Sequence, residues 1–116
     1  MLQDDTVTYT ANQNAEGCAW QSIAGQVIGM DGRPIIGLAV LVTGENFEQI
    51  EFSGSADEFG PSGYEVWLNN TPLEGEYEVQ LLNTTGQPLS EVIIVQTLSA
   101  CERNVAIANF SQRSAY

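Results

Sequence analysis

The chain has 116 residues, 43% hydrophobic and 9% aromatic, which is enough for one domain with a core and too few for two of ordinary size. Its 15 acidic residues face only three arginines, and the net charge of -12 disfavours nucleic acid and anionic membranes as partners. Because His and Lys are absent, Ser-His-Asp and Cys-His catalysis, imidazole metal sites and Schiff bases are excluded.

The head of the chain, residues 1–17, is polar, ends in ANQNAEG and predicts an N-terminal linker or extended arm. Its run TVTYT at 6–10 has the composition of a strand, which suggests pairing with the open sheet edge of a neighbouring molecule. No stretch approaches the roughly 20 apolar residues of a membrane span, so we expect no membrane insertion.

Two cysteines, Cys18 and Cys101, bracket the predicted domain. Two buried free thiols would also fit this count, but the bracketing positions and the acidic composition favour a disulfide formed in an oxidising compartment. We therefore expect a secreted or cell-surface domain over residues 18–110, followed by a tail at 111–116.

Alternation with period 2 dominates the rest of the chain and predicts strands rather than helices. In FEQIEF, for example, Ile50 and Phe52 share one face while Gln49 and Glu51 share the other. The predicted strands lie at 23–30, 38–44, 47–52, 64–68, 76–82, 90–97 and 104–110, separated by turn sequences. A longer Gly/Ser/acidic loop, SGSADEFGPSG, occupies 53–63. This pattern predicts an all-β sandwich of about seven antiparallel strands in two sheets.

The glycine-rich segment GQVIGMDGRPIIGLAVLVTGEN at 25–46 has two interpretations. A phosphate-binding loop needs its glycines before a helix, but here the alternating LAVLV follows, and neither GxGxxG nor GxxxxGK[ST] is present. The segment instead predicts two strands joined by a turn at Asp31, Gly32 and Pro34.

With this strand assignment, Asp31-Gly32-x-Pro34-Ile35-x-Gly37 and the following alternating run resemble the opening of carboxypeptidase regulatory-like domains. These are transthyretin-like (prealbumin-like) modules related to CNA-B repeats. Later segments at 63–66 and 73–81 resemble that family's later strands. The resemblance covers roughly residues 22–110 and implies a Greek-key sandwich that serves as a non-catalytic accessory within a larger secreted or surface protein. It carries over no catalytic residue.

Aromatic side chains offer one candidate ligand surface. Trp67, Tyr64 and Phe59 are candidates for stacking on a sugar ring. The alternation places Trp67 on the face of its strand opposite Tyr64, so we expect Trp67 to be partly exposed. Trp20, two residues from Cys18, is interpreted as packing over the disulfide.

Carboxylates offer the other candidates. Asp57 and Glu58 in the long loop, with Glu45, are candidate Ca2+ ligands, although their spacing matches neither an EF-hand nor a nonapeptide loop and solvated acids are the alternative. Glu65, together with glutamates 76 and 78, is a remote candidate for glycoside hydrolysis. Sequons at Asn69, Asn83 and Asn109 are sites for glycosylation in a source that glycosylates.

Together these features predict a non-catalytic structural or binding module of a larger extracellular protein, needing no cofactor and contacting neighbouring domains of the same polypeptide. Two alternatives stay open. The first is a carbohydrate-binding module that uses the aromatics near residues 53–67. The second is a subunit of an extracellular assembly joined through the N-terminal arm.

Overall fold

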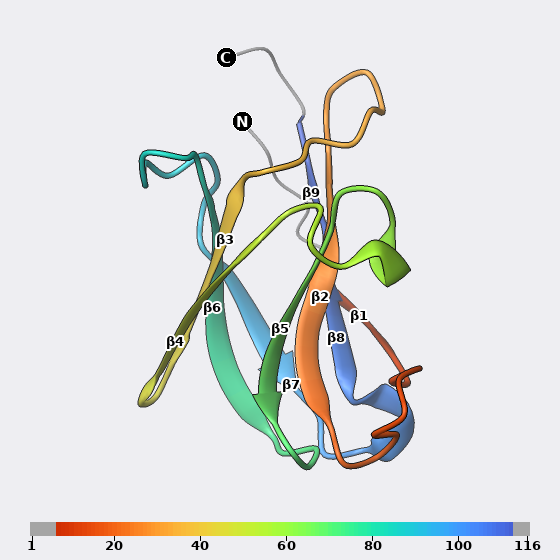
Figure 1. Ribbon diagram of the computed structural model, residues 1–116. Coiled ribbons are helices and arrows are strands. Elements are labelled where there is room, and N and C mark those ends of the chain that lie inside the picture. The colour runs from red at the N-terminus through yellow and green to blue at the C-terminus, as the bar shows by residue number, and fades with distance from the viewer. Residues whose placement is uncertain (1–6, 113–116) are drawn as a thin grey trace.

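The computed structural model describes residues 7–112, which form two packed β-sheets (Figure 1). The first sheet has the order β1 (Val7–Thr10), β8 (Val105–Ala108), β2 (Gln21–Ile28) and β5 (Gly63–Asn69), and the short β9 (Phe110–Ser111) also pairs with β2. The second has the order β4 (Phe47–Phe52), β3 (Ala39–Gly44), β6 (Gly75–Leu82) and β7 (Ile93–Thr97). Two 3-10 turns, η1 (Asp57–Phe59) and η2 (Cys101–Arg103), lie in the connections. The predicted all-β sandwich is confirmed.

The sequence predicted only antiparallel strands, but two of the strand pairs are parallel. β8 and β9 both run parallel to β2, while β8 is antiparallel to β1. The chain reaches β8 from the other sheet through η2 and not by a hairpin, so no tight turn forces an antiparallel pairing with β2.

The core lies between the two sheets and follows the predicted alternation. In β5, Tyr64 and Val66 point inward and are fully buried, while Trp67 points outward. The other strands also point alternate side chains into the core. The fully buried apolar side chains of the core include Ile23, Val27, Val40, Val42, Val79, Leu81, Val95 and Phe110.

β4 keeps the predicted alternation, and its apolar face points outward. Ile50 and Phe52 point to solvent with 43% and 51% exposure, while Gln49 and Glu51 lie opposite buried Val42 and Val40 on the inner face. The register is set by the two-residue turn Glu45–Asn46, because Gly44 pairs with Phe47 and Asn46 takes a left-handed backbone conformation (φ 57°). Ile50 and Phe52 therefore form an uncovered apolar stripe on the outer face of the second sheet.

The domain boundaries differ from the predicted ones. Residues 7–10, expected within a linker or arm, form β1 and pair with β8 of the same chain (Figure 1). Ser111, expected in the tail, pairs with Ile28. One edge of β1 is thus occupied by its own domain. Residues 1–6 of the predicted arm and 113–116 of the predicted tail lie outside the described residues.

The glycine-rich segment is two strands joined by a turn, as predicted. The Gly29 N–H donates to the Arg33 carbonyl at 2.7 Å, and Gly32 takes the left-handed conformation (φ 83°) that favours glycine. A strand and not a helix follows, so the segment presents no helix N-terminus to a phosphate. Over the described part of the chain, no helix is long and apolar enough to span a membrane.

Candidate functional site

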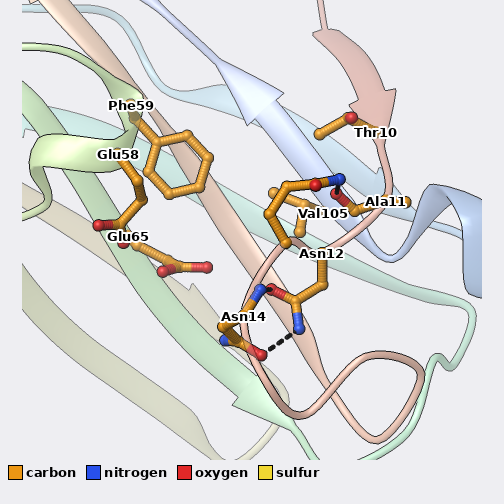
Figure 2. A pocket seen from close by; sticks show the side chains of 9 residues that line it. Thr10, Ala11, Asn12, Asn14, Glu58, Phe59, Glu65 and Val105 are labelled. Carbon is orange, nitrogen blue, oxygen red and sulfur yellow. Dashed lines mark hydrogen bonds between the residues drawn. The ribbon is translucent and has the colours of Figure 1, made fainter.

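A groove of about 370 Å³ lies on the outer face of the first sheet (Figure 2). Its walls come from the arm segment, defined as residues 10–14, and from Glu58 and Phe59 of η1. Glu65 of β5 and Val105 of β8 form the remainder of the lining. We call this site the arm groove.

Strand register explains why these side chains meet. Glu65 and Trp67 pair with Ala24 and Ser22 of β2, and Ser22 pairs with Val105 of β8, so all five belong to the outer face. Ser22 and Ala24 are nevertheless fully buried. The arm segment and η1 therefore lie over this part of the sheet and convert a flat face into a groove.

Glu65 is a partly buried carboxylate of the arm groove that two hydrogen bonds hold in place. One of its oxygens, Oε2, accepts hydrogen bonds from Ser22 Oγ at 2.7 Å and from Trp20 Nε1 at 3.2 Å. Burial raises the pKa of Glu65, the two donors oppose that rise, and the neighbouring Glu58 carboxylate, within hydrogen-bonding reach, adds to it. Glu58 and Glu65 thus lie together in the groove as a carboxylate pair.

This raised pKa gives a pH-dependent contribution to stability. A carboxyl whose pKa is higher in the folded chain holds its proton more tightly there, so its contribution is present at low pH and is lost as pH rises through that pKa. We expect Glu65→Gln to become progressively more stable than wild type as pH rises from roughly 4 to 8. Urea unfolding across this range measures the difference, with exposed Glu48→Gln as the control for lost charge; a pH-independent difference at Glu65 would contradict the assignment.

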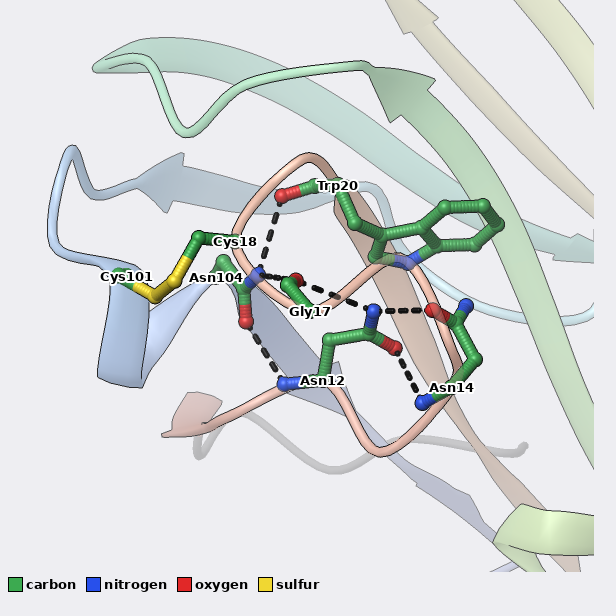
Figure 3. Close-up of a disulfide and its surroundings, with 7 residues drawn as sticks. All are labelled: Asn12, Asn14, Gly17, Cys18, Trp20, Cys101 and Asn104. Atoms are coloured by element: carbon green, nitrogen blue, oxygen red, sulfur yellow. Dashed lines mark hydrogen bonds between the residues drawn. A yellow bond between two sulfur atoms is a disulfide. The ribbon is translucent and has the colours of Figure 1, made fainter.

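Aromatic rings extend the groove on one side. Trp67 is 46% exposed, and its ring lies 6.5 Å from that of Trp20, tilted by 52°. Phe59 lines the groove itself. The structure therefore brings Trp67 and Phe59 to one region, as the sequence suggested, and adds Trp20. The interpretation of Trp20 as a cover for the disulfide is wrong, because its indole reaches Glu65 and points away from the sulfurs in Figure 3.

Tyr64 is not part of this surface, contrary to its place among the sugar-stacking candidates. It is fully buried, packs against Phe110 with ring centroids 6.5 Å apart, and donates its hydroxyl to the Ala108 carbonyl. The reason is the alternation itself, which turns Tyr64 inward when Trp67 faces solvent.

The buried hydroxyl of Tyr64 predicts a stability effect. Tyr64→Phe is expected to lower the free energy of unfolding by about 1 to 2 kcal/mol, because the Ala108 carbonyl loses its buried donor. Chemical denaturation measures the loss. The partly buried Tyr9, whose hydroxyl makes an exposed hydrogen bond to the Gln96 carbonyl, gives a matched Tyr→Phe control with a smaller expected effect; equal losses at both positions would contradict the role of burial.

The candidate calcium ligands do not form a site. Glu45 borders a second hollow, between the β3–β4 turn and residues 75–78, whereas Glu58 lines the arm groove. Within residues 7–112, no three carboxylate or cysteine side chains gather as metal ligands. The grouping of Asp57 and Glu58 with Glu45 is therefore wrong, because the two segments end at different parts of the sandwich. Glutamates 76 and 78 also border the second hollow, whereas Glu65 lines the arm groove, so they do not form a hydrolytic pair with Glu65.

The sequon asparagines are engaged in hydrogen bonds within the domain, and none is fully exposed. Their partners are Gln21 Oε1 for Asn69, Gln87 Oε1 for Asn83 and the Gln26 N–H for Asn109. Asn109 also lies close to Gly25, where an added Cβ would collide with the Ala108 carbonyl.

The arm segment is anchored by a buried amide and a neighbouring disulfide (Figure 3). Asn104, only 1% exposed, accepts a hydrogen bond from the Asn12 N–H at 2.7 Å and donates to the carbonyls of Gly17 and Trp20 at 2.9 and 3.1 Å. Next to it the predicted disulfide joins Cys18 to Cys101, with Cα atoms 5.1 Å apart. The groove wall is therefore fixed to η2 and β8 by a covalent bond and a buried amide.

Sequence reasoning missed the arm segment and Asn104 as parts of a site. Asparagine-rich loops are common, and only the pairing of β1 with β8 shows that this loop crosses the sheet face. Glu65 was considered only for hydrolysis; its position two residues before a predicted exposed Trp67 was the one signal that placed it on the same face.

The chain is thus an all-β sandwich with one disulfide, carrying a groove of carboxylate, amide and aromatic groups. No protein-family model and no curated protein matches it. Among solved structures it is similar to the dioxygenase domain of a dioxygenase carbohydrate-binding protein fusion from the cellulolytic bacterium Streptomyces sp. SirexAA-E. The similarity has a TM-score of 0.51 and 13% identity, and it covers 90% of this chain and 86% of that chain. At this identity it shows a shared fold and nothing about the groove.

Proposed function

We propose that this domain is a non-catalytic binding module of a larger secreted or cell-surface protein, and that the arm groove takes a carbohydrate. The observation that carries the proposal is the combination of exposed Trp67, whose ring lies tilted beside that of Trp20, with the groove near them. Aromatic faces stack on the apolar faces of sugar rings, and the amides and carboxylates of the groove suit hydroxyl groups. The volume falls at the lower end of the range of about 300–1,000 Å³ for ligand pockets.

Two features support a non-catalytic role. Glycoside hydrolases hold their two carboxylates about 5 to 9.5 Å apart across the scissile bond, whereas those of Glu58 and Glu65 are within hydrogen-bonding reach of each other. The chain also lacks the His and Lys side chains that activate most other nucleophiles. The proposal needs no metal or cofactor.

The compartment and the partners are also parts of the proposal. A disulfide in a small β domain is typical of secreted and surface proteins. The resemblance to carboxypeptidase regulatory-like domains suggests that neighbouring domains of the same polypeptide are its partners. A module of this kind would bring such neighbours to a glycan.

A glycan array tests the proposal directly. We expect wild type to bind one class of glycan, and Trp67→Ala to weaken binding at least about tenfold, because an exposed aromatic platform is lost. The matched control is Phe52→Ala, which removes an equally exposed aromatic ring from the other sheet and is expected to leave binding unchanged. Mass spectrometry of the bound glycan should show no cleavage. Absence of binding by wild type, or equal loss in both variants, would overturn the carbohydrate proposal.

A further inference from the structure

The arm groove is acidic, and no arginine of residues 7–112 lines it. The chain has no Lys or His, and its arginines number three. Of the two in the described residues, Arg33 is exposed and pairs with Asp31 at 3.3 Å, and neither Arg33 nor Arg103 lines the groove. The two carboxylates of the groove thus face each other and its neutral side chains.

The carboxylates of Glu58 and Glu65 have oxygens that can accept hydrogen bonds from a ligand. Both hydrogen-bond donors to Glu65 use the same oxygen, Oε2, which fixes the carboxylate on Ser22 and Trp20. The second oxygen of Glu65 and the carboxylate of Glu58 are then available to the groove (Figure 2). An ammonium group has three donors and no acceptor, so it can donate to both carboxylates at once.

The other residues that line the groove favour an ammonium group over a metal ion as the ligand. Among residues 7–112 no third carboxylate joins the pair, as a calcium site would need. Phe59 lines the groove, and the face of its ring attracts an organic cation, because aromatic rings carry negative charge on their faces. The amides of Asn12 and Asn14 line the opposite wall, where hydrogen bonds to each other and to the loop backbone hold that wall in shape.

We infer that the ligand of the arm groove is an amino sugar with a free, protonated amine, of the kind present in oligosaccharides of glucosamine. The inference rests on the proposed carbohydrate function and narrows it to a cationic class. A neutral sugar would cover the Glu58 and Glu65 carboxylates without supplying a counter-charge, which costs free energy. An N-acetylated sugar has the same ring but an uncharged amide in place of the ammonium.

A calorimetric titration with two oligosaccharides of equal length, one of glucosamine and one of N-acetylglucosamine, tests the inference. At about pH 6.5 we expect the glucosamine oligomer to bind at least about tenfold more tightly, and the preference to fall toward one in Glu58→Gln and Glu65→Gln. Glu48→Gln, which removes an exposed carboxylate from the other sheet, should keep the preference. The NMR signal of the Trp20 indole N–H should shift with the amine oligomer, because that proton is bonded to Glu65.

The outcomes separate the inference from the proposed function. Equal binding of both oligomers, with dependence on Trp67, would overturn the inference and leave the carbohydrate function standing. Tight binding of the glucosamine oligomer that is unchanged in Glu58→Gln and Glu65→Gln would show attraction to the overall charge of -12, and would also overturn the inference. Binding of neither oligomer nor any other glycan would overturn both. Because Glu58 is exposed, its Gln variant tests the inference even if the Glu65 variant fails to fold.

Discussion

Breaking the Cys18–Cys101 disulfide is expected to lower the free energy of unfolding by about 4 to 5 kcal/mol. The bridge joins positions 83 residues apart, and in the chain-entropy treatment a cross-link of that span strongly restricts the unfolded chain. Such a loss is a large share of the 5–15 kcal/mol that stabilises a typical domain. Urea unfolding with and without a reductant measures it.

The double variant Cys18→Ser, Cys101→Ser is the control for this effect. It should unfold as reduced wild type does and should not respond to the reductant. A reduced protein within about 1 kcal/mol of the oxidised one would contradict the expectation, and would mean that the sandwich core restricts the chain ends without the bridge.

Asn104→Ala is expected to cost about 2 to 4 kcal/mol, the next largest effect. The truncation removes the partner of three main-chain groups: the Asn12 N–H and the carbonyls of Gly17 and Trp20. Each buried polar group left without a partner costs about 1 to 3 kcal/mol, and water that enters the exposed part of the loop offsets some of the total. Denaturant titration gives the change in stability.

Two further variants make the Asn104 prediction specific. Asn104→Asp keeps an acceptor for the Asn12 N–H but loses both donors, so it should also be destabilised, and more so as its new carboxyl ionises. Gln13→Ala removes an exposed side chain from the same loop and should stay within about 0.5 kcal/mol of wild type. Similar losses in Asn104→Ala and Gln13→Ala would rule out a central role for the buried amide.

Much of the fold could be predicted from the sequence because alternation and turn residues are local signals. The strands in FEQIEF and EYEVQLL lie where the pattern predicts, as β4 and β6. Which face of β4 points inward was not predictable, because the turn at Asn46 sets the register and overrides the apolar preference of Ile50. The pairing of β1 with β8 and the parallel pairing of β8 with β2 depend on contacts between the two ends of the chain. A short stretch of sequence cannot reveal such contacts.

The candidate site was predicted only in part, for a similar reason. Trp67 was placed correctly because its exposure follows from alternation along one strand. The pairing of Glu58 with Glu65 and the contact of Trp20 with Glu65 join three separate segments, so their chemistry emerges only when the segments fold together. Tyr64 was assigned by residue type against its own strand pattern, and the pattern was the better guide.

The outward stripe of Ile50 and Phe52 also has a consequence for how molecules behave in concentrated solution. Uncovered apolar side chains on an edge strand favour association between copies, and mutual repulsion of molecules that each carry a charge of -12 opposes it. That repulsion disappears near the isoelectric point of about 4.1 and weakens in salt. Colloidal stability of this domain therefore depends on its acidic surface, and acidification would favour precipitation through the β4 edge while the sandwich itself is still folded.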